Sequence, residues 1–165
     1  MRDDTPDYFR RKFILNLEPI RTTHQADLRI LKTKDGRQFI GKMAKSGIKA
    51  WIRDFKDAVL KMDRAIPDRP FEGPLEVSLY FGFPNIQADK GKVMPMTTKP
   101  DADNLAKAVL DALTDLGFWG DDSQIVVLHI SKIRTPSPFV GVCTSQCLYM
   151  DKLYEQAVRE CTFRA

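Results

Sequence analysis

The chain has 165 residues, of which 43% are hydrophobic and 29% charged, as in a folded globular domain and unlike a disordered chain. No stretch approaches the roughly 18 consecutive apolar residues of a membrane span, and the acid-containing start does not resemble a secretory signal, so we expect a cytoplasmic protein. The net charge of +4 is unevenly spread: residues 1–70 hold 17 Lys/Arg against 10 Asp/Glu, and residues 71–165 hold 9 against 12. A basic half beside an acidic half is a weak indication of nucleic-acid binding.

The first half of the chain predicts a strand, a hairpin and a helix. The apolar run at residues 13–17 predicts a strand that stops before Pro19. Asp35-Gly36 stands between two short apolar runs, which favours a hairpin. Apolar residues at helical spacing then predict an amphipathic helix over about residues 46–65, ended by the prolines that begin at Pro67.

The middle of the chain predicts a strand, a loop and a second helix. Apolar and polar residues alternate over residues 75–81, as in a half-buried strand. Residues 85–100 contain Lys, Gly and Pro with little apolar content and predict a loop. An apolar stripe over residues 105–116 predicts a helix that Gly117 closes.

The last part predicts two strands and a helical tail. Residues 125–133 are rich in β-branched side chains and indicate a strand, and a turn with two prolines follows. A last strand is expected over residues 139–142, continued around residues 147–150, and residues 151–165 are expected to form a helical tail. This order predicts a single α+β domain over residues 1–165, with a small mixed β-sheet packed with two main helices.

Three cysteines, Cys143, Cys147 and Cys161, lie in the last quarter of the chain. Their odd number argues against a disulfide framework. Cys143 and Cys147 are spaced like half of a zinc site, which Cys161 and His129 could complete. Because a matching second pair of ligands is missing from the sequence, idle or buried thiols are the better interpretation.

The segment from Lys99 to Lys107, KPDADNLAK, concentrates the residues that could carry chemistry. Asp101 and Asp103 are two apart, so on extended chain they project from the same side, and Asp103 suits a helix N-cap. Lys107 lies one helical turn beyond Asp103. The alternative is purely structural: acids at a helix start complement its dipole, and Lys107 could simply pair with Asp111.

A second acidic segment, Gly120 to Ser123, is predicted to form the turn before the next strand. Taken alone, Asp121-Asp122 is most often a solvated turn. Gathered carboxylates would nevertheless suit Mg²⁺, which takes oxygen ligands and can bridge to a substrate phosphate, polarise it and activate water. A helix of about twelve residues is ~18 Å long, so this turn reaches Asp101 and Asp103 only if the chain returns along the helix.

The run from Lys99 to about Val127 resembles the signature of the RusA family of Holliday-junction resolvases. It combines Asp-x-Asp-Asn-Leu-x-Lys, the helix end Asp-Ala-Leu, and Asp-Asp-Ser-Gln-Ile at fixed separation and without a gap. Weaker similarity covers the first strand with its basic loop, the first helix and the strand before the acidic loop.

The resemblance implies a RusA-like fold and a crossover junction endodeoxyribonuclease that depends on Mg²⁺, with Mn²⁺ as a possible substitute. It implies metal-binding carboxylates at Asp101, Asp103 and Asp122, a catalytic lysine at Lys107, and supporting roles for Asn104 and Asp121. It also implies that the second helix and the acidic turn come together. The implied partners are four-way junction DNA and a second copy of the chain, in a homodimer that makes paired symmetric nicks in DNA recombination and repair, in a prophage, phage or host setting.

Before the first aspartate this chain has Thr97-Thr98-Lys99-Pro100, where some family members have an arginine run. Contacts to DNA phosphates are therefore expected from other basic residues: Arg21, Arg29, Lys32, Lys90, Lys92 and Lys99. Phe81, Phe83 and Phe118 could wedge into a junction, but their apolar surroundings favour the core.

Two other functions compete with the nuclease. The first is a catalytically inactive module that binds branched DNA, which would be expected to have lost one of the three aspartates. The second is a metal-dependent hydrolase of small phosphates, which the basic first half and the absence of a P-loop in the sequence disfavour.

Overall fold

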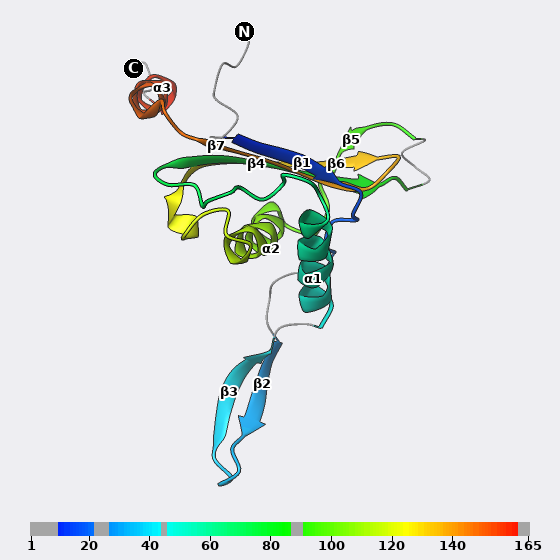
Figure 1. Cartoon of the computed structure of the whole chain (residues 1–165). Coiled ribbons are helices and arrows are strands. Elements are labelled where there is room, and N and C mark those ends of the chain that lie inside the picture. Colours follow the sequence, from blue (N-terminus) through cyan, green and yellow to red (C-terminus); the bar gives the residue numbers. More distant parts are fainter. Residues whose placement is uncertain (1–9, 22–26, 44–45, 87–90, 162–165) are drawn as a thin grey trace.

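The computed structural model describes residues 10–21, 27–43, 46–86 and 91–161, and its centre is a five-stranded mixed sheet (Figure 1). The strand order is β1-β7-β4-β6-β5. β4 pairs in parallel with β6 and antiparallel with β7, and β1 pairs antiparallel with β7. These strands are β1 (Arg10–Leu15), β4 (Leu75–Pro84), β5 (Met94–Pro95), β6 (Ile125–Thr135) and β7 (Phe139–Gln146).

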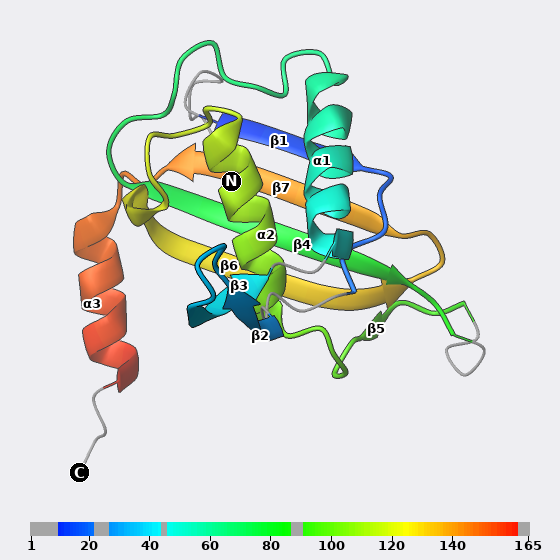
Figure 2. The ribbon, with the colours of Figure 1, turned by 90° about the horizontal axis from the view of Figure 1, so that it is seen from below.

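Two helices, α1 (Ser46–Leu60) and α2 (Ala102–Asp115), cover one face of this sheet (Figure 2). The alternation of apolar and polar side chains along β4 determines which face of the sheet the helices cover. The odd-numbered residues from Leu75 to Phe83 point to that face and are all fully buried. α2 contributes a stripe of small and branched residues to the same core, including Leu105, Val109 and Leu113. The predicted α+β fold, with a mixed sheet and two main helices, is confirmed.

A separate two-stranded hairpin, β2 (Asp27–Lys32) with β3 (Gln38–Met43), extends away from the helix-covered side of the sheet (Figure 1). Its register pairs Ile30 with Ile40, and Gly36 supplies the positive φ of 87° that the turn requires. The predicted Asp35-Gly36 turn is confirmed. A two-stranded hairpin is marginally stable on its own.

The end of the chain differs from the prediction. β7 stops at Gln146, and the backbone N–H of Cys147 donates to the carbonyl of Pro74 outside the sheet. The expected strand around residues 147–150 is therefore wrong. Helix α3 (Met150–Cys161) follows, on the side of the sheet away from α1 and α2 (Figure 1). It covers most of the tail predicted over residues 151–165, whose last four residues lie outside the described ranges. Among the described residues, no helix combines the length and the apolar character needed to cross a membrane.

Candidate active site

Asp101 and Asp103 lie where the loop that follows β5 becomes helix α2. Asp101 is the N-cap residue, with extended backbone (φ −72°, ψ 147°), and its side chain makes no capping hydrogen bond. Asp103 lies in the first turn of the helix. The prediction of Asp103 as the N-cap is therefore wrong, because the helix begins two residues earlier. Both carboxylates are exposed, and both lie at the N-terminal end of the helix.

Lys107 lies one turn farther along α2, on its exposed side. Its Nζ atom is 3.1 Å from Oδ1 of Asp111, and 60% of its side chain is exposed. The i, i+4 pairing with Asp111 is thus present. A pair this exposed contributes little stability, so the ammonium group remains accessible to a phosphate. Asn104, between the acids and Lys107, is half-buried.

Lys132 of β6 holds the loop that leads into Asp101. Its Nζ atom donates hydrogen bonds to the carbonyl oxygens of Thr98 (2.8 Å) and Pro100 (2.6 Å). Sequence analysis missed this residue. The one available signal was a lysine within a strand rich in β-branched residues, which also fits a solvated position.

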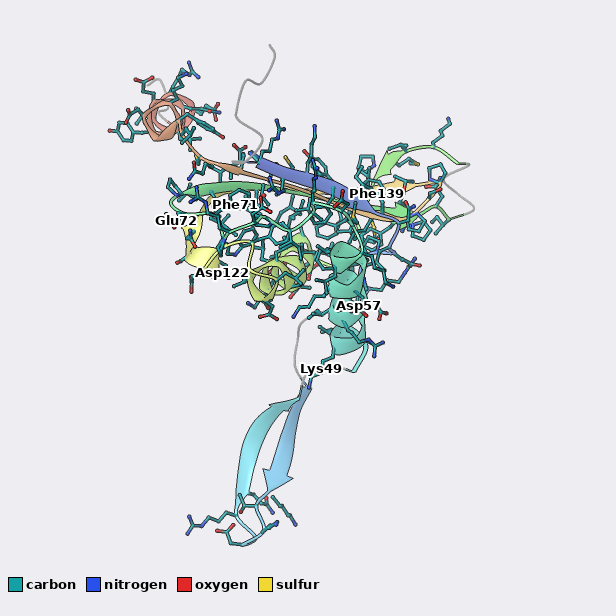
Figure 3. All side chains as sticks on the ribbon, viewed as in Figure 1. Lys49, Asp57, Phe71, Glu72, Asp122 and Phe139 are labelled. Atoms are coloured by element: carbon teal, nitrogen blue, oxygen red, sulfur yellow. The ribbon has the colours of Figure 1, made fainter. Side chains whose placement is uncertain are left out.

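The acidic turn contains a short 3₁₀ helix, η3 (Asp122–Gln124), which Asp121 caps. Oδ1 of Asp121 accepts a hydrogen bond of 2.8 Å from the N–H of Ser123. The side-chain and backbone hydrogen bonds of Ser123 lower the pKa of Asp121 below its ordinary value. Asp122 follows with an exposed carboxylate on the helix-covered side of the sheet (Figure 3).

Gln124 fastens this turn to a distant loop. Its Oε1 atom accepts hydrogen bonds from the backbone N–H groups of Gly120 (2.9 Å) and Asp121 (3.2 Å). Its Nε2 atom donates to the carbonyls of Phe71 (3.1 Å) and Gly73 (3.2 Å). The position of Asp122 is therefore set by contacts that do not involve the start of α2.

The two acidic groups lie at opposite ends of α2 (Figure 2). The helix has 14 residues and is therefore about 21 Å long. β6 gives a measure of the separation: η3, which begins with Asp122, directly precedes this strand, whereas Lys132, which bonds to Pro100, lies about 23 Å along it. No three His, Cys, Asp or Glu side chains of the described residues are close enough to hold a metal ion. The acidic turn does contact α2, as expected, but Asp122 does not join Asp101 and Asp103 in one group of ligands within one chain.

The basic residues expected to contact DNA are spread over the surface. Lys32 near the tip of the hairpin arm is exposed, as are Lys92 and Lys99 in the loop before Asp101. Arg21 is also exposed, and it pairs with Glu18 at 2.5 Å. Arg29 is placed in β2 by its backbone, and Lys90 lies outside the described residues.

Several other sequence candidates belong to the core. Phe81, Phe83 and Phe118 are fully buried, as expected from their apolar surroundings. Cys143 is half-buried and Cys147 buried, and neither forms a disulfide. The side chain of Cys161 is outside the described set, so the zinc alternative with Cys161 and His129 is not tested.

Comparison with known proteins connects this site to a nuclease family. The model of the family described as Endodeoxyribonuclease RusA matches residues 23–143. The chain is 50% identical to the uncharacterized protein YqaN of Bacillus subtilis (strain 168) over 56 residues, which is 34% of this chain and 38% of that protein. It is also 50% identical, over 40 residues, to the crossover junction endodeoxyribonucleases RusA of Escherichia coli (strain K12) and Enterobacteria phage 82. These 40 residues are 24% of this chain and 33% of each enzyme, so the aligned part spans about a third of the curated relatives' length.

Proposed function

This chain belongs to the RusA family of endodeoxyribonucleases, and we propose on that basis that it cuts four-way (Holliday) DNA junctions by paired symmetric nicks, in recombination and repair. One observation supports this proposal most. The family-like segment KPDADNLAK forms an exposed turn that enters α2, with both carboxylates and Lys107 open to solvent. A buried or fully paired set would favour a structural role instead.

The proposed reaction depends on Mg²⁺, with Mn²⁺ as a substitute. Carboxylates such as those of Asp101, Asp103 and Asp122 are the donors that such hard cations prefer. The three do not meet within one chain, so a single copy does not offer a complete metal site. Lys107 has a separate role, because its ammonium group would stabilise the additional negative charge that develops on the attacked phosphate. Asn104 and Asp121 would support these residues.

DNA binding is proposed to rest on phosphate contacts by basic residues. The hairpin arm, residues 27–43, holds five Lys/Arg against two Asp/Glu, and it extends from the side of the sheet where α2 lies (Figure 1). Such contacts carry no sequence information, so selectivity would come from the branched shape and deformability of the junction. A homodimer would present two active sites related by a two-fold axis, as paired nicks require.

The test is cleavage of a labelled synthetic four-way junction with and without Mg²⁺, comparing wild type with Asp103→Asn. We expect symmetric nicks that require the metal and disappear in the variant, while the variant still binds the junction. Binding of junction DNA by wild type without cleavage, over a range of sequences and metals, would instead identify an inactive branched-DNA-binding module. Cleavage of free nucleotides but not of junctions would identify a hydrolase of small phosphates.

A further inference from the structure

Ile30 is an apolar side chain that is open to solvent in the middle of the hairpin arm. It lies in β2 and is 68% exposed, whereas Ile48 at the start of α1 is 4% exposed. Among the described strands, β2 and β3 pair only with each other and form a sheet apart from the five-stranded one. The arm extends away from the helix layer (Figure 1), so the body of the protein does not cover this isoleucine.

A cluster of cations lies next to Ile30 at the tip of the arm. Lys32, Lys34 and Arg37 are all exposed there, together with one acid, Asp35. Asp35 pairs with Arg37 at 3.3 Å, and within the described part of the chain neither lysine pairs with an acid. The side chains of the tip project away from the rest of the molecule (Figure 3). The tip therefore offers two uncompensated cations to DNA phosphates.

The strand geometry fixes the distance between the isoleucine and the nearest of these cations. Ile30 and Lys32 are two residues apart, so their side chains lie on the same face of β2. Their Cα atoms are about 7 Å apart at the ordinary rise of a strand, which is about two base steps of a DNA strand. Beyond Lys32, the N–H of Thr33 donates a hydrogen bond of 2.9 Å to the carbonyl of Arg37 and closes the tip. A lysine bound to a phosphate would thus set Ile30 beside the bases of the same strand.

We propose that Ile30 inserts between two bases at the branch point of a DNA junction, while the lysines of the arm tip hold neighbouring phosphates. The inference rests on the proposed function and deepens it, because it names a residue that distinguishes a junction from a duplex. Proteins that kink DNA insert isoleucine and similar apolar side chains between base steps. Two-stranded β-ribbons are among the elements that enter the grooves of DNA.

The branch point is where this insertion costs least. In a continuous duplex, the side chain must first separate two stacked base pairs. Bases that are already poorly stacked need less energy for this step, and the base pairs at a strand exchange are of that kind. The isoleucine leaves water when it contacts the faces of the bases. Phosphate contacts by the lysines carry no such preference, so Ile30 is the part of the arm that selects the junction.

Fluorescence of a base analogue tests the insertion. A synthetic four-way junction with 2-aminopurine at the branch point is titrated without divalent metal, so that no strand is cut. We expect wild type to raise the fluorescence, because 2-aminopurine becomes brighter when it is unstacked. Ile30→Ala should lose most of this rise. It should also bind the junction about tenfold more weakly, because less apolar surface is buried, while its affinity for a duplex of the same length stays close to that of wild type.

Three further variants separate insertion from support of the hairpin, in which Ile30 lies opposite Ile40. Ile30→Thr keeps the β-branched shape that favours a strand but loses the apolar end of the side chain, so it should behave like Ile30→Ala. Ile30→Leu keeps the apolar reach and should retain most of the fluorescence rise. Ile14→Ala is the surface control: Ile14 on β1 is exposed (64%) on the main sheet, and this variant should match wild type. If Ile30→Thr matches wild type, Ile30 only supports the hairpin and the insertion is refuted.

Failure of the insertion and failure of the proposed function give different results. If wild type leaves the fluorescence unchanged, or if Ile30→Ala weakens junction and duplex binding equally, the insertion is refuted. Cleavage of the junction by wild type with Mg²⁺, measured separately, would then still support the nuclease. If wild type instead unstacks the branch point through Ile30 but cuts no junction with any metal, the nuclease is refuted and the insertion is supported.

Discussion

The ammonium group of Lys132 donates a hydrogen bond of 2.6 Å to the carbonyl oxygen of Pro100, the residue directly before Asp101. Together with the bond to Thr98, this contact lets a rigid strand hold the loop that presents the first carboxylate. We expect Lys132→Met to lower the rate of junction cleavage at least about tenfold, since hydrogen bonds to a charged group contribute about 1.5–3 kcal/mol and each 1.4 kcal/mol is about a factor of ten. Cleavage rates and Mn²⁺ titration measure the effect.

Two comparisons separate positioning by Lys132 from general damage. Lys132→Arg keeps a charged donor and should recover part of the lost metal affinity, while Lys152→Met on the exposed surface of α3 should behave as wild type. If Lys132→Met binds Mn²⁺ as tightly as wild type, Lys132 does not position Asp101.

Lys107 and Asp111 are paired, yet we expect their substitutions to differ. Lys107→Met should lower junction cleavage by about 100-fold or more while leaving junction binding within about threefold, since it removes transition-state stabilisation. Asp111→Asn should change cleavage by less than about threefold, because an exposed pair contributes little. Single-turnover cleavage and fluorescence anisotropy measure the two effects. Equal losses in both variants would favour a structural role for the pair.

The hairpin arm should contribute to DNA affinity in a salt-dependent way. Removing two arm charges with Lys32→Ala and Lys34→Ala should weaken junction binding and lower the slope of log K against log salt by about one per phosphate contact. Lys61→Ala, at an exposed position just after α1, serves as the charge control. Anisotropy titrations between low and moderate salt would give the slopes. Unchanged slopes in the double variant would exclude arm contacts with phosphates.

Stability at alkaline pH should depend on Tyr149. Burial, followed by the hydrogen bond that its hydroxyl donates to Glu76, raises the pKa of Tyr149 above its ordinary value of 10.0. Above about pH 10 the unfolded chain loses this proton first, so the free energy of unfolding falls as the pH rises. Denaturant unfolding of Tyr149→Phe should show a shallower fall in that range. Tyr154→Phe, on an exposed residue of α3, should retain the wild-type slope.

Apolar periodicity predicted the elements that build the core, since the pattern of β4 and the stripe of α2 are local properties of the sequence. Element ends were less predictable. The first helix stops at Leu60 because the chain turns there, with the N–H of Met62 bonded to Val59 and Arg64 at a φ of 56°. β5 was not predicted because its two residues form a strand only by pairing with β6.

The sequence predicted which residues belong to the candidate site but not how they are placed in three dimensions. Spacing identified Asp101, Asp103 and Lys107 as neighbours because they share one helix start. The distance to Asp122 depends on β6 running beside β4 in parallel, which sets the acidic turn at the far end of α2. Lys132 bonds to a residue that is 32 positions earlier in the sequence. A local sequence pattern does not predict such a long-range contact.

The double engagement of Gln124 changes how the family's Asp-Asp-x-Gln pattern is understood. Each end of this amide is used, one as acceptor for the turn and the other as donor to the residue 71–73 loop. Glutamate has nearly the same shape but cannot donate to those two carbonyls. In related sequences, a glutamine at this position therefore indicates that the acidic turn is hydrogen-bonded to the loop that corresponds to residues 71–73. This holds independently of whether the neighbouring acids still support catalysis.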